Sequence, residues 1–280
     1  MKLLRYGEKG RERPGLLDQD GCIRDLSEHI DDLSGNALET GTLMRLAAID
    51  PRSLPMIEGE VRLGPCVGRV GKFIAISLNF GDHAAEVEQE VPQEPVVLLK
   101  ATSSISGPND DVVIPRGSTK VDWEVELGVV IGKGGVYIDE ADALDHVAGY
   151  CIVNDVSARD FQMERGGTWD KGKGCDTFGP LGPWLVTKDE AGDVSNLDMW
   201  LEVDGKRYQD GSTRTMIFGI AEIVSYVSGF MSLQSGDVIT TGTPPGNGMA
   251  QIPPVFLKPG NVMHLHIDKL GEQRQRVVSS

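Results

Sequence analysis

The stretch from Val121 to Ile131 constrains the fold of this chain most, because carboxylates and large apolar residues alternate in it before an aliphatic run begins. Successive side chains of a β-strand point to opposite faces, so this alternation predicts a strand. Glu124 and Glu126 would share one face, roughly 6.6 Å apart along the strand, while every second residue from Trp123 to Leu127 would share the other. The carboxylates either face a partly dry space or form the solvated side of an edge strand.

Two carboxylates in a partly dry space are unfavourable together unless a proton or a cation compensates them. Hard divalent cations prefer oxygen ligands, and Mg²⁺ suits a site with few carboxylates and retained water. The pair therefore predicts a divalent-metal site if other segments contribute to it.

Composition excludes some classes of function. The 280 residues include 42 acidic and 27 basic ones, for a formal net charge of -15, which disfavours nucleic acid or an anionic membrane as a partner. The four cysteines, at positions 22, 66, 151 and 175, form no closely spaced pair, so we expect a reducing compartment, the cytoplasm. No apolar run approaches the length of a membrane span.

The order of the expected elements predicts a mixed, β-rich α+β fold. Short strands and a helical stretch at 38–49 form an expected small N-terminal domain, residues 1–65, and Pro and Gly punctuate a linker around 52–70. Strands then dominate a larger domain, residues 70–280, whose clearest helix is expected at 220–233. Strands that far outnumber helices favour a sandwich, roll or barrel over a doubly wound sheet.

A histidine and a carboxylate stand three residues apart after the expected strand 73–78. If a helix begins there, His83 and Glu86 lie on one face, and Glu86 can orient the imidazole as a base. In the alternative, this is an exposed first turn in which Asp82 is the cap and His83 is solvated.

A second polar group follows the buried-looking strand 148–153. Asp155, at the end of that strand, can supply a third carboxylate beside Glu124 and Glu126, or it can simply cap the next helix. Helical spacing puts Arg159 and Gln162 on one face.

Two loops complete the polar set. Lys173 lies in a Gly-rich loop and either presents a positive charge to an anionic substrate or is an ordinary solvated lysine. Glycines in the segment 240–248 let main-chain N–H groups approach a ligand. No Gly-Lys-Ser/Thr follows them, so a nucleotide-phosphate loop has little support.

Taken in order and spacing, these motifs resemble the fumarylacetoacetate hydrolase family over roughly residues 70–279. The residues that carry the resemblance are Asn79-x-x-Asp82-His83-x-x-Glu86, Glu124-Val125-Glu126-Leu127, Asn154-Asp155-Val156-Ser157-Ala158-Arg159-Asp160-x-Gln162, Lys173-x-x-Asp176-Thr177-x-x-Pro180 and Gly242-Thr243-Pro244. The resemblance implies the family's mixed β-sandwich roll, with the small N-terminal domain in front of it. It also implies a homodimer or a dimer of dimers.

The resemblance further implies a role for each residue. Mg²⁺, or Mn²⁺, would be held by three carboxylates, and a 2-oxo acid would complete its shell. His83, oriented by Glu86, would activate water, and Asp176 with Thr177 would support the loop. Metal ligands, catalytic residues and substrate-binding residues would be, in that order, Glu124, Glu126 and Asp155; His83, Glu86 and Lys173; and Arg159, Gln162, Thr243, Ser77 and Asp82.

Within the family, the opening residues and the run 107–117 resemble bacterial 2,4-diketo-3-deoxy-L-rhamnonate and L-fuconate hydrolases, which are often labelled ureidoglycolate lyase. The implied reaction is hydrolysis of a C–C bond in a 2,4-diketo acid, giving pyruvate and L-lactate in sugar-acid catabolism. Phe80, where the family often has tyrosine, puts the substrate tail in question. Oxaloacetate decarboxylation or tautomerisation, simple acylpyruvate hydrolysis and a non-catalytic metal-stabilised binding protein remain alternatives.

Overall fold

The alternating stretch forms two strands, β8 (Val121–Asp122) and β9 (Val125–Ile131), in the computed structural model, which describes residues 1–280. The single strand that we predicted is interrupted at Trp123 and Glu124. The N–H of Glu124 donates to Asn154 Oδ1 at 3.2 Å, and the N–H of Val125 donates to Gln209 Oε1 at 2.9 Å. These two N–H groups therefore bond to side chains and not to the main chain of a neighbouring strand. The predicted division of faces is confirmed, because Trp123 and Leu127 pack in the main core while Glu124 and Glu126 line a pocket.

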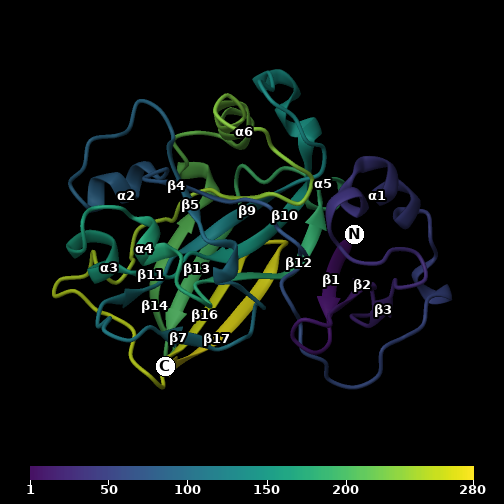
Figure 1. Ribbon diagram of the computed structural model, residues 1–280, viewed down its shortest axis with the longest axis horizontal. Helices are drawn as coiled ribbons and strands as arrows, with labels where there is room; N and C mark the ends of the chain where they lie inside the picture. Colours follow the sequence, from purple (N-terminus) through teal and green to yellow (C-terminus); the bar gives the residue numbers. More distant parts are fainter.

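Most strands belong to one large sheet (Figure 1). Its order is β3-β2-β1-β12-β10-β9-β15-β4-β5, with β6 beside β12. The bounds of the strands not yet given are β1 Lys2–Tyr6, β2 Arg13–Leu17, β3 Ile23–Asp25, β4 Phe73–Ser77, β5 Val96–Lys100, β6 Ile105–Ser106, β10 Val147–Asn154, β12 Gly179–Thr187 and β15 Val238–Thr240.

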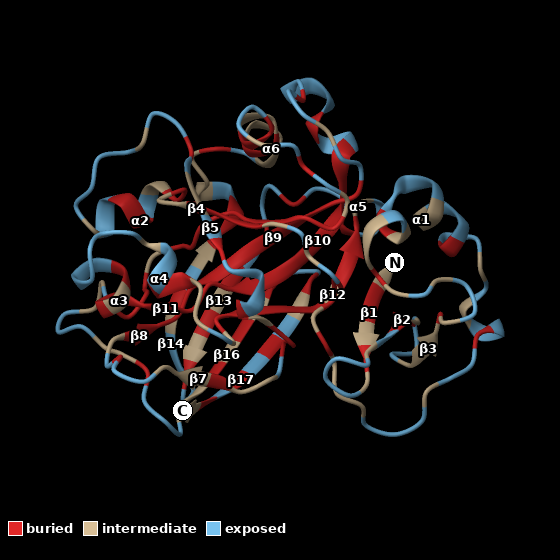
Figure 2. Ribbon diagram, in the orientation of Figure 1, coloured by how far each residue is buried: buried red, intermediate tan, exposed pale blue.

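A second sheet, of order β14-β13-β16-β17-β7, packs against the large one, and β11 pairs with β8 in a short ribbon. Aliphatic residues of β9, β13 and β16 meet in the main core between the sheets. Figure 2 shows the central strands as buried and the peripheral loops as exposed. The bounds are β7 Val112–Ile114, β11 Ser157–Ala158, β13 Asp198–Val203, β14 Lys206–Ser212, β16 Val262–Ile267 and β17 Gly271–Ser279.

The helices are short and lie around the periphery of the two sheets (Figure 1). The helix expected at 220–233 ends at Ser228, because Gly229 follows and the chain turns so that the N–H of Leu233 donates to the carbonyl of Gly135 at 2.8 Å. The bounds are α1 Thr40–Ala47, α2 Gly81–Glu86, α3 Arg159–Glu164, α4 Asp170–Lys173, α5 Lys188–Ala191 and α6 Ile220–Ser228. The strand-rich α+β class predicted from the sequence is confirmed. No helix is long and apolar enough to cross a bilayer.

The first 65 residues share both a sheet and a core with the rest of the chain. Strand β1 pairs with β12 in the register Leu3↔Leu185. Leu3 and Leu16 pack in a second core together with Val130 of β9, on the opposite face of the large sheet from the main core. The division at 1–65 and 70–280 stays a prediction, and the structure shows how closely the two parts are joined.

Arg62 links the N-terminal strands to the larger part of the chain. Its guanidinium donates to Glu12 Oε1 at 2.9 Å and to both carboxylate oxygens of Asp110, at 2.7 and 2.6 Å. Burial raises the pKa of both carboxyls, but the hydrogen bonds from Arg62 and from main-chain N–H groups outweigh it and hold each pKa below its usual value. A depressed carboxyl pKa adds stability above the unfolded pKa, and that stability is lost as the pH falls through the folded pKa.

Replacing Arg62 with methionine is therefore expected to lower the free energy of unfolding by ~1–3 kcal/mol at pH 7, because two carboxylates lose their charged donor. Urea unfolding at pH 7 and at a pH below about 4 tests this, since the difference between variant and parent should shrink as the carboxyls are protonated. Arg52→Met is the control, because Arg52 lies at 3.8 Å from Asp20 in an exposed pair. An equal loss of unfolding free energy at both pH values would contradict the link between the contribution of Arg62 and the ionisation of the two carboxyls.

Candidate active site

Three buried carboxylates meet where β9 begins and β10 ends. Glu124, Glu126 and Asp155 each place an oxygen within 4.8 Å of the other two. Glu124 precedes β9, Glu126 lies in it two residues later, and Asp155 follows β10, which pairs with β9 through Asn154 and Val125. The local strand pairing therefore brings together residues that are 31 positions apart in the chain.

Two lysines neutralise part of this negative charge. Lys173 Nζ donates to Glu124 Oε2 at 2.8 Å and to Asp155 Oδ2 at 2.5 Å. Lys100 Nζ donates to Asp155 Oδ1 at 2.5 Å and to the carbonyl of Lys173 at 2.6 Å. Burial lowers the pKa of Lys173, but the charges of Asp155 and Glu124 outweigh it and raise the pKa above its usual value. For Lys100 burial prevails over the attraction of Asp155, and its pKa is lowered.

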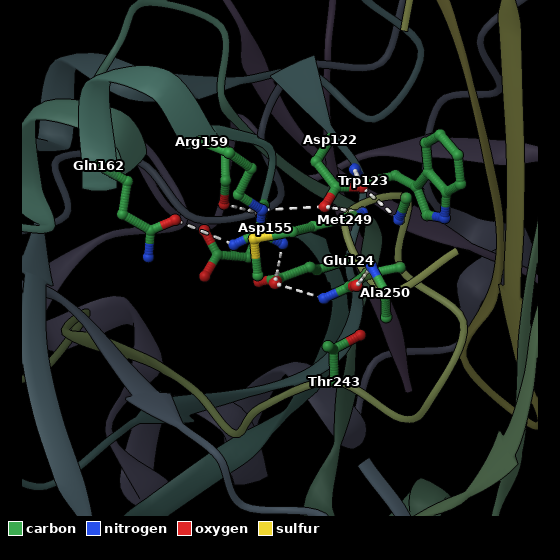
Figure 3. Close-up of polar contacts among 12 residues, drawn as sticks. Asp122, Trp123, Glu124, Asp155, Arg159, Gln162, Thr243, Met249 and Ala250 are labelled. Carbon is green, nitrogen blue, oxygen red and sulfur yellow. Dashed lines mark hydrogen bonds and ion pairs between the residues drawn. The ribbon is translucent and has the colours of Figure 1, made fainter. Parts of the chain in front are cut away.

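Arg159 stands behind Glu124, and each of its three guanidinium nitrogens donates a hydrogen bond there (Figure 3). Nη2 donates to Glu124 Oε1 at 2.5 Å, Nε to Asp122 Oδ2 at 2.8 Å and Nη1 to Gln162 Oε1 at 3.0 Å. Burial raises the pKa of Glu124, but the charges of Arg159 and Lys173 hold it well below the usual range. Glu124 is therefore a carboxylate in the folded protein.

Glu126 has a different environment. Its Oε2 accepts hydrogen bonds from Thr240 Oγ1 at 2.5 Å and from the N–H of Gly242 at 2.8 Å. Burial and the neighbouring charges of Asp155 and Glu124 raise the pKa of Glu126 well above its usual value. No lysine or arginine bonds directly to this carboxyl, so it is the member of the cluster that most needs a cation.

The histidine dyad lies on α2, as the spacing predicted. His83 Nδ1 is 2.9 Å from Glu86 Oε2, and both oxygens of Glu86 accept from the N–H of Gly246, at 3.0 and 3.1 Å. If Nδ1 donates to Glu86, Nε2 keeps the lone pair that a general base uses. Gly246 has φ +102°, and a Cβ there would lie 1.9 Å from the Tyr208 carbonyl oxygen, so only glycine allows this approach.

Thr243 is fixed by the second sheet. Its hydroxyl donates to the carbonyl of Val125 at 2.9 Å and accepts from Gln209 Nε2 at 2.8 Å. Because the hydroxyl hydrogen is engaged, the hydroxyl offers a substrate only an acceptor. The main-chain N–H of Thr243 has no partner within the chain, so it is the donor that this residue can offer to a substrate carboxylate.

Most of the predicted residues surround one pocket. Those that line it are Ser77, His83, Glu124, Glu126, Asp155, Lys173 and Thr243. Glu86 lies behind His83, and Arg159 and Gln162 lie behind Glu124, where they position residues of the pocket. Asp82 is exposed and accepts from Thr215 Oγ1 at 3.2 Å, outside the lining. Thr177 Oγ1 accepts from the N–H of Val113 at 2.9 Å and so supports its loop.

Sequence reasoning missed three residues that shape this pocket. Lys100 ends an otherwise apolar strand, and a lysine directly after Val-Val-Leu-Leu was a usable signal. Thr240 and Gln209 carried no such signal, because their partners Glu126 and Thr243 are distant in the chain and only the folded sheets bring them together.

The donor set fits a hard divalent ion. The candidate ligands are carboxylate oxygens, all three residues are buried, and the free Oε1 of Glu126 has no hydrogen-bond partner in the chain. Carboxylate oxygens are the ligands that Mg²⁺ and Mn²⁺ prefer over softer metals. Glu124, Glu126 and Asp155 would hold such an ion.

Comparisons with known proteins find similar proteins over almost the whole chain. Residues 72–278 match the family model described as fumarylacetoacetate (FAA) hydrolase C-terminal. A Burkholderia ambifaria protein, whose name describes it only as a provisional hydrolase, is 65% identical over 276 residues, covering 98% of each chain.

Solved structures extend the likeness to the whole fold. The fumarylacetoacetate hydrolase of Exiguobacterium antarcticum superposes with a TM-score of 0.90 at 34% identity, over 100% of both chains. A 5-carboxymethyl-2-hydroxymuconate delta-isomerase from Mycobacterium smegmatis gives 0.77 at 30% identity, over 100% of this chain and 99% of that one. The maleylpyruvate hydrolase of Sphingobium sp. SYK-6, in complex with manganese (II) and pyruvate, gives 0.82 at 30% identity, over 100% of both.

Proposed function

Because the chain belongs to the fumarylacetoacetate hydrolase family, whose members hydrolyse or isomerise keto acids, we propose that it is a metal-dependent hydrolase of 2,4-diketo acids. One observation carries the proposal: His83, backed by Glu86, faces the same pocket as the three carboxylates. A metal site alone serves many reactions, whereas a base beside it supplies the activated water that hydrolysis requires.

When bound by Glu124, Glu126 and Asp155, the divalent ion would polarise the 2-oxo group and stabilise developing enolate charge. The name of the Sphingobium structure, a hydrolase with manganese and pyruvate, supports a divalent ion and a pyruvate product here.

The residues of this chain carry the remaining steps. His83 Nε2 takes a proton from water, and the hydroxide oxygen bonds to C4 of the substrate. The C3–C4 bond then breaks, its electron pair goes to C3, and the imidazolium returns the proton there. Lys173, 2.8 Å from Glu124, offers positive charge to the developing anion. The products are pyruvate and a second carboxylic acid, and water is the only co-reactant.

For the substrate itself we propose 2,4-diketo-3-deoxy-L-rhamnonate or L-fuconate, which would give pyruvate and L-lactate. The tail of such an acid carries one hydroxyl, on C5. Ser77 lines the pocket, so its hydroxyl is available to a hydroxylated tail. A site that hydrogen-bonds a substrate hydroxyl discriminates strongly against analogues that lack it.

Isomerisation is the second candidate, supported by the name of the Mycobacterium smegmatis structure. Isomerisation and oxaloacetate decarboxylation use the same enolate but need no attacking water. The products separate the candidates, because only hydrolysis of a 2,4-diketo acid releases pyruvate together with a second acid.

We expect the Mg²⁺- or Mn²⁺-loaded protein to release pyruvate from a 2,4-diketo acid, followed by coupled oxidation of NADH with lactate dehydrogenase. The chelated protein should be inactive and should recover on addition of either ion. Chromatography of the second acid identifies the bond that breaks. Turnover that survives complete chelation would refute metal dependence, and conversion without pyruvate would favour isomerisation.

A further inference from the structure

We propose that the pocket accepts 2-oxo acids with an uncharged tail and rejects those whose tail ends in a second carboxylate. This inference rests on the proposed function, because it concerns the substrate of the same site. It is carried by the charges around the pocket, which leave no cation for a second carboxylate.

Each basic group of the buried site already bonds to at least one carboxylate. Arg159 bridges Asp122 and Glu124, as described above, and each of its three guanidinium nitrogens donates one hydrogen bond. Lys100 and Lys173 are both bound to Asp155, and their side chains are 0% and 4% exposed. A second carboxylate on the substrate tail would have to compete for these cations with the buried carboxylates that already bind them.

The formal charges of the buried site, a divalent ion and one substrate carboxylate add up to zero. Asp122, Glu124, Glu126 and Asp155 exceed the three cations by one negative charge. A divalent ion turns this into one positive charge, and the carboxylate of a 2-oxo acid neutralises it. A second carboxylate would add a negative charge with no counterpart in a buried space.

The walls available to a tail are uncharged. They come from the end of β4, where Ala75, Ile76, Ser77 and Leu78 line the pocket, and from Leu98 of β5. The tail therefore meets aliphatic groups and one hydroxyl.

The segment that connects β4 to β5 is acidic. From Gly81 to Leu99 the chain holds five Asp or Glu residues and no Lys or Arg. This segment includes α2, whose His83 lines the pocket, and the loop that leads from α2 to β5 (Figure 1). Like charges near a binding site disfavour the wrong partner, so the segment adds to the rejection of a dianion.

A matched pair of substrates tests the inference. 2,4-Dioxoheptanoate and 2,4-dioxoheptanedioate have equal chain length and differ only in the terminal carboxylate. With the Mg²⁺-loaded protein we expect kcat/KM for pyruvate release to be ~10²-fold or more higher for the monocarboxylate. Equal values, or a preference for the dicarboxylate, would overturn the inference while leaving the hydrolase in place.

A designed cation gives the opposite test. Leu98→Lys should place an ammonium beside the tail and reduce the preference at least ~10-fold, because it supplies the missing counter-charge. Leu98→Met is the matched control, which changes the shape of the same wall without adding charge, and its preference should stay near that of the parent. If both variants reduce the preference equally, shape and not charge sets the selectivity, and the inference fails.

Binding without turnover separates this inference from the proposed function. Calorimetry on the metal-loaded protein should show 2-oxopentanoate binding at least ~10-fold more tightly than 2-oxoglutarate, which has the same length and a second carboxylate. If neither heptanoate substrate is cleaved, the proposed hydrolase function is overturned, and this binding ratio still decides the charge inference. Tighter binding of 2-oxoglutarate would refute it.

Discussion

Alanine in place of His83 is expected to lower the kcat of C–C hydrolysis by ~10²- to 10⁴-fold, the usual contribution of a general base. The carboxylates that would hold the metal lie on β9 and after β10, whereas His83 lies on α2, so the substitution leaves the metal site intact. Calorimetry should therefore show unchanged Mg²⁺ affinity. KM should change much less than kcat, because only the activation of water is removed.

His264→Ala is the matched control for this variant. That histidine lies on β16 in the second sheet, with Nε2 at 2.9 Å from Glu272, and its ring is partly exposed. Its removal should leave kcat near that of the parent. A His83→Ala protein that hydrolyses within twofold of the parent would exclude His83 as the base.

The sequence predicted the contacts within short segments well. His83 with Glu86, and Arg159 with Gln162, are three residues apart, and helical geometry brings each pair into contact once the helix exists. The alternation around Glu124 and Glu126 likewise follows from the strand period alone. Local geometry determines these contacts, so spacing is enough to find them.

Contacts between distant segments could be predicted only in part. Arg159 was expected to bind substrate, yet Asp122 and Glu124 occupy its guanidinium, and nothing in its spacing indicates this. Gln209 of β14, in the second sheet, bonds to Val125 and to Thr243. No local sequence pattern indicates these contacts, because they depend on how the two sheets pack. The pairing of β1 with β12 could not be predicted from local patterns either, because the partner of a strand depends on the arrangement of the whole chain. The expected homodimer stays a prediction.

Glutamine in place of Glu126 is expected to separate the stability of this protein from its function. The metal-free protein already favours a neutral side chain here, because burial and the charges of Asp155 and Glu124 raise the pKa of Glu126. A glutamine carbonyl can still accept from Thr240 Oγ1 and from the N–H of Gly242. The free energy of unfolding without metal should therefore match or exceed that of the parent.

With Mg²⁺ bound, the parent should be more stable than the Glu126→Gln variant. Glutamine removes one anionic ligand from a site that holds only three, so Mg²⁺ affinity should fall by ~10²-fold or more and pyruvate release should fall with it. A ligand that binds only the folded protein stabilises it in proportion to the logarithm of one plus the ratio of free ligand concentration to Kd, so added Mg²⁺ should raise the Tm of the parent but not that of Glu126→Gln. Glu202→Gln on β13, where the carboxylate pairs with Arg207 far from the pocket, is the control and should keep both affinity and the Tm shift. Parent-like Mg²⁺ binding and turnover in Glu126→Gln would refute the three-carboxylate site. A large loss of unfolding free energy without metal would show that Glu126 stabilises the fold itself.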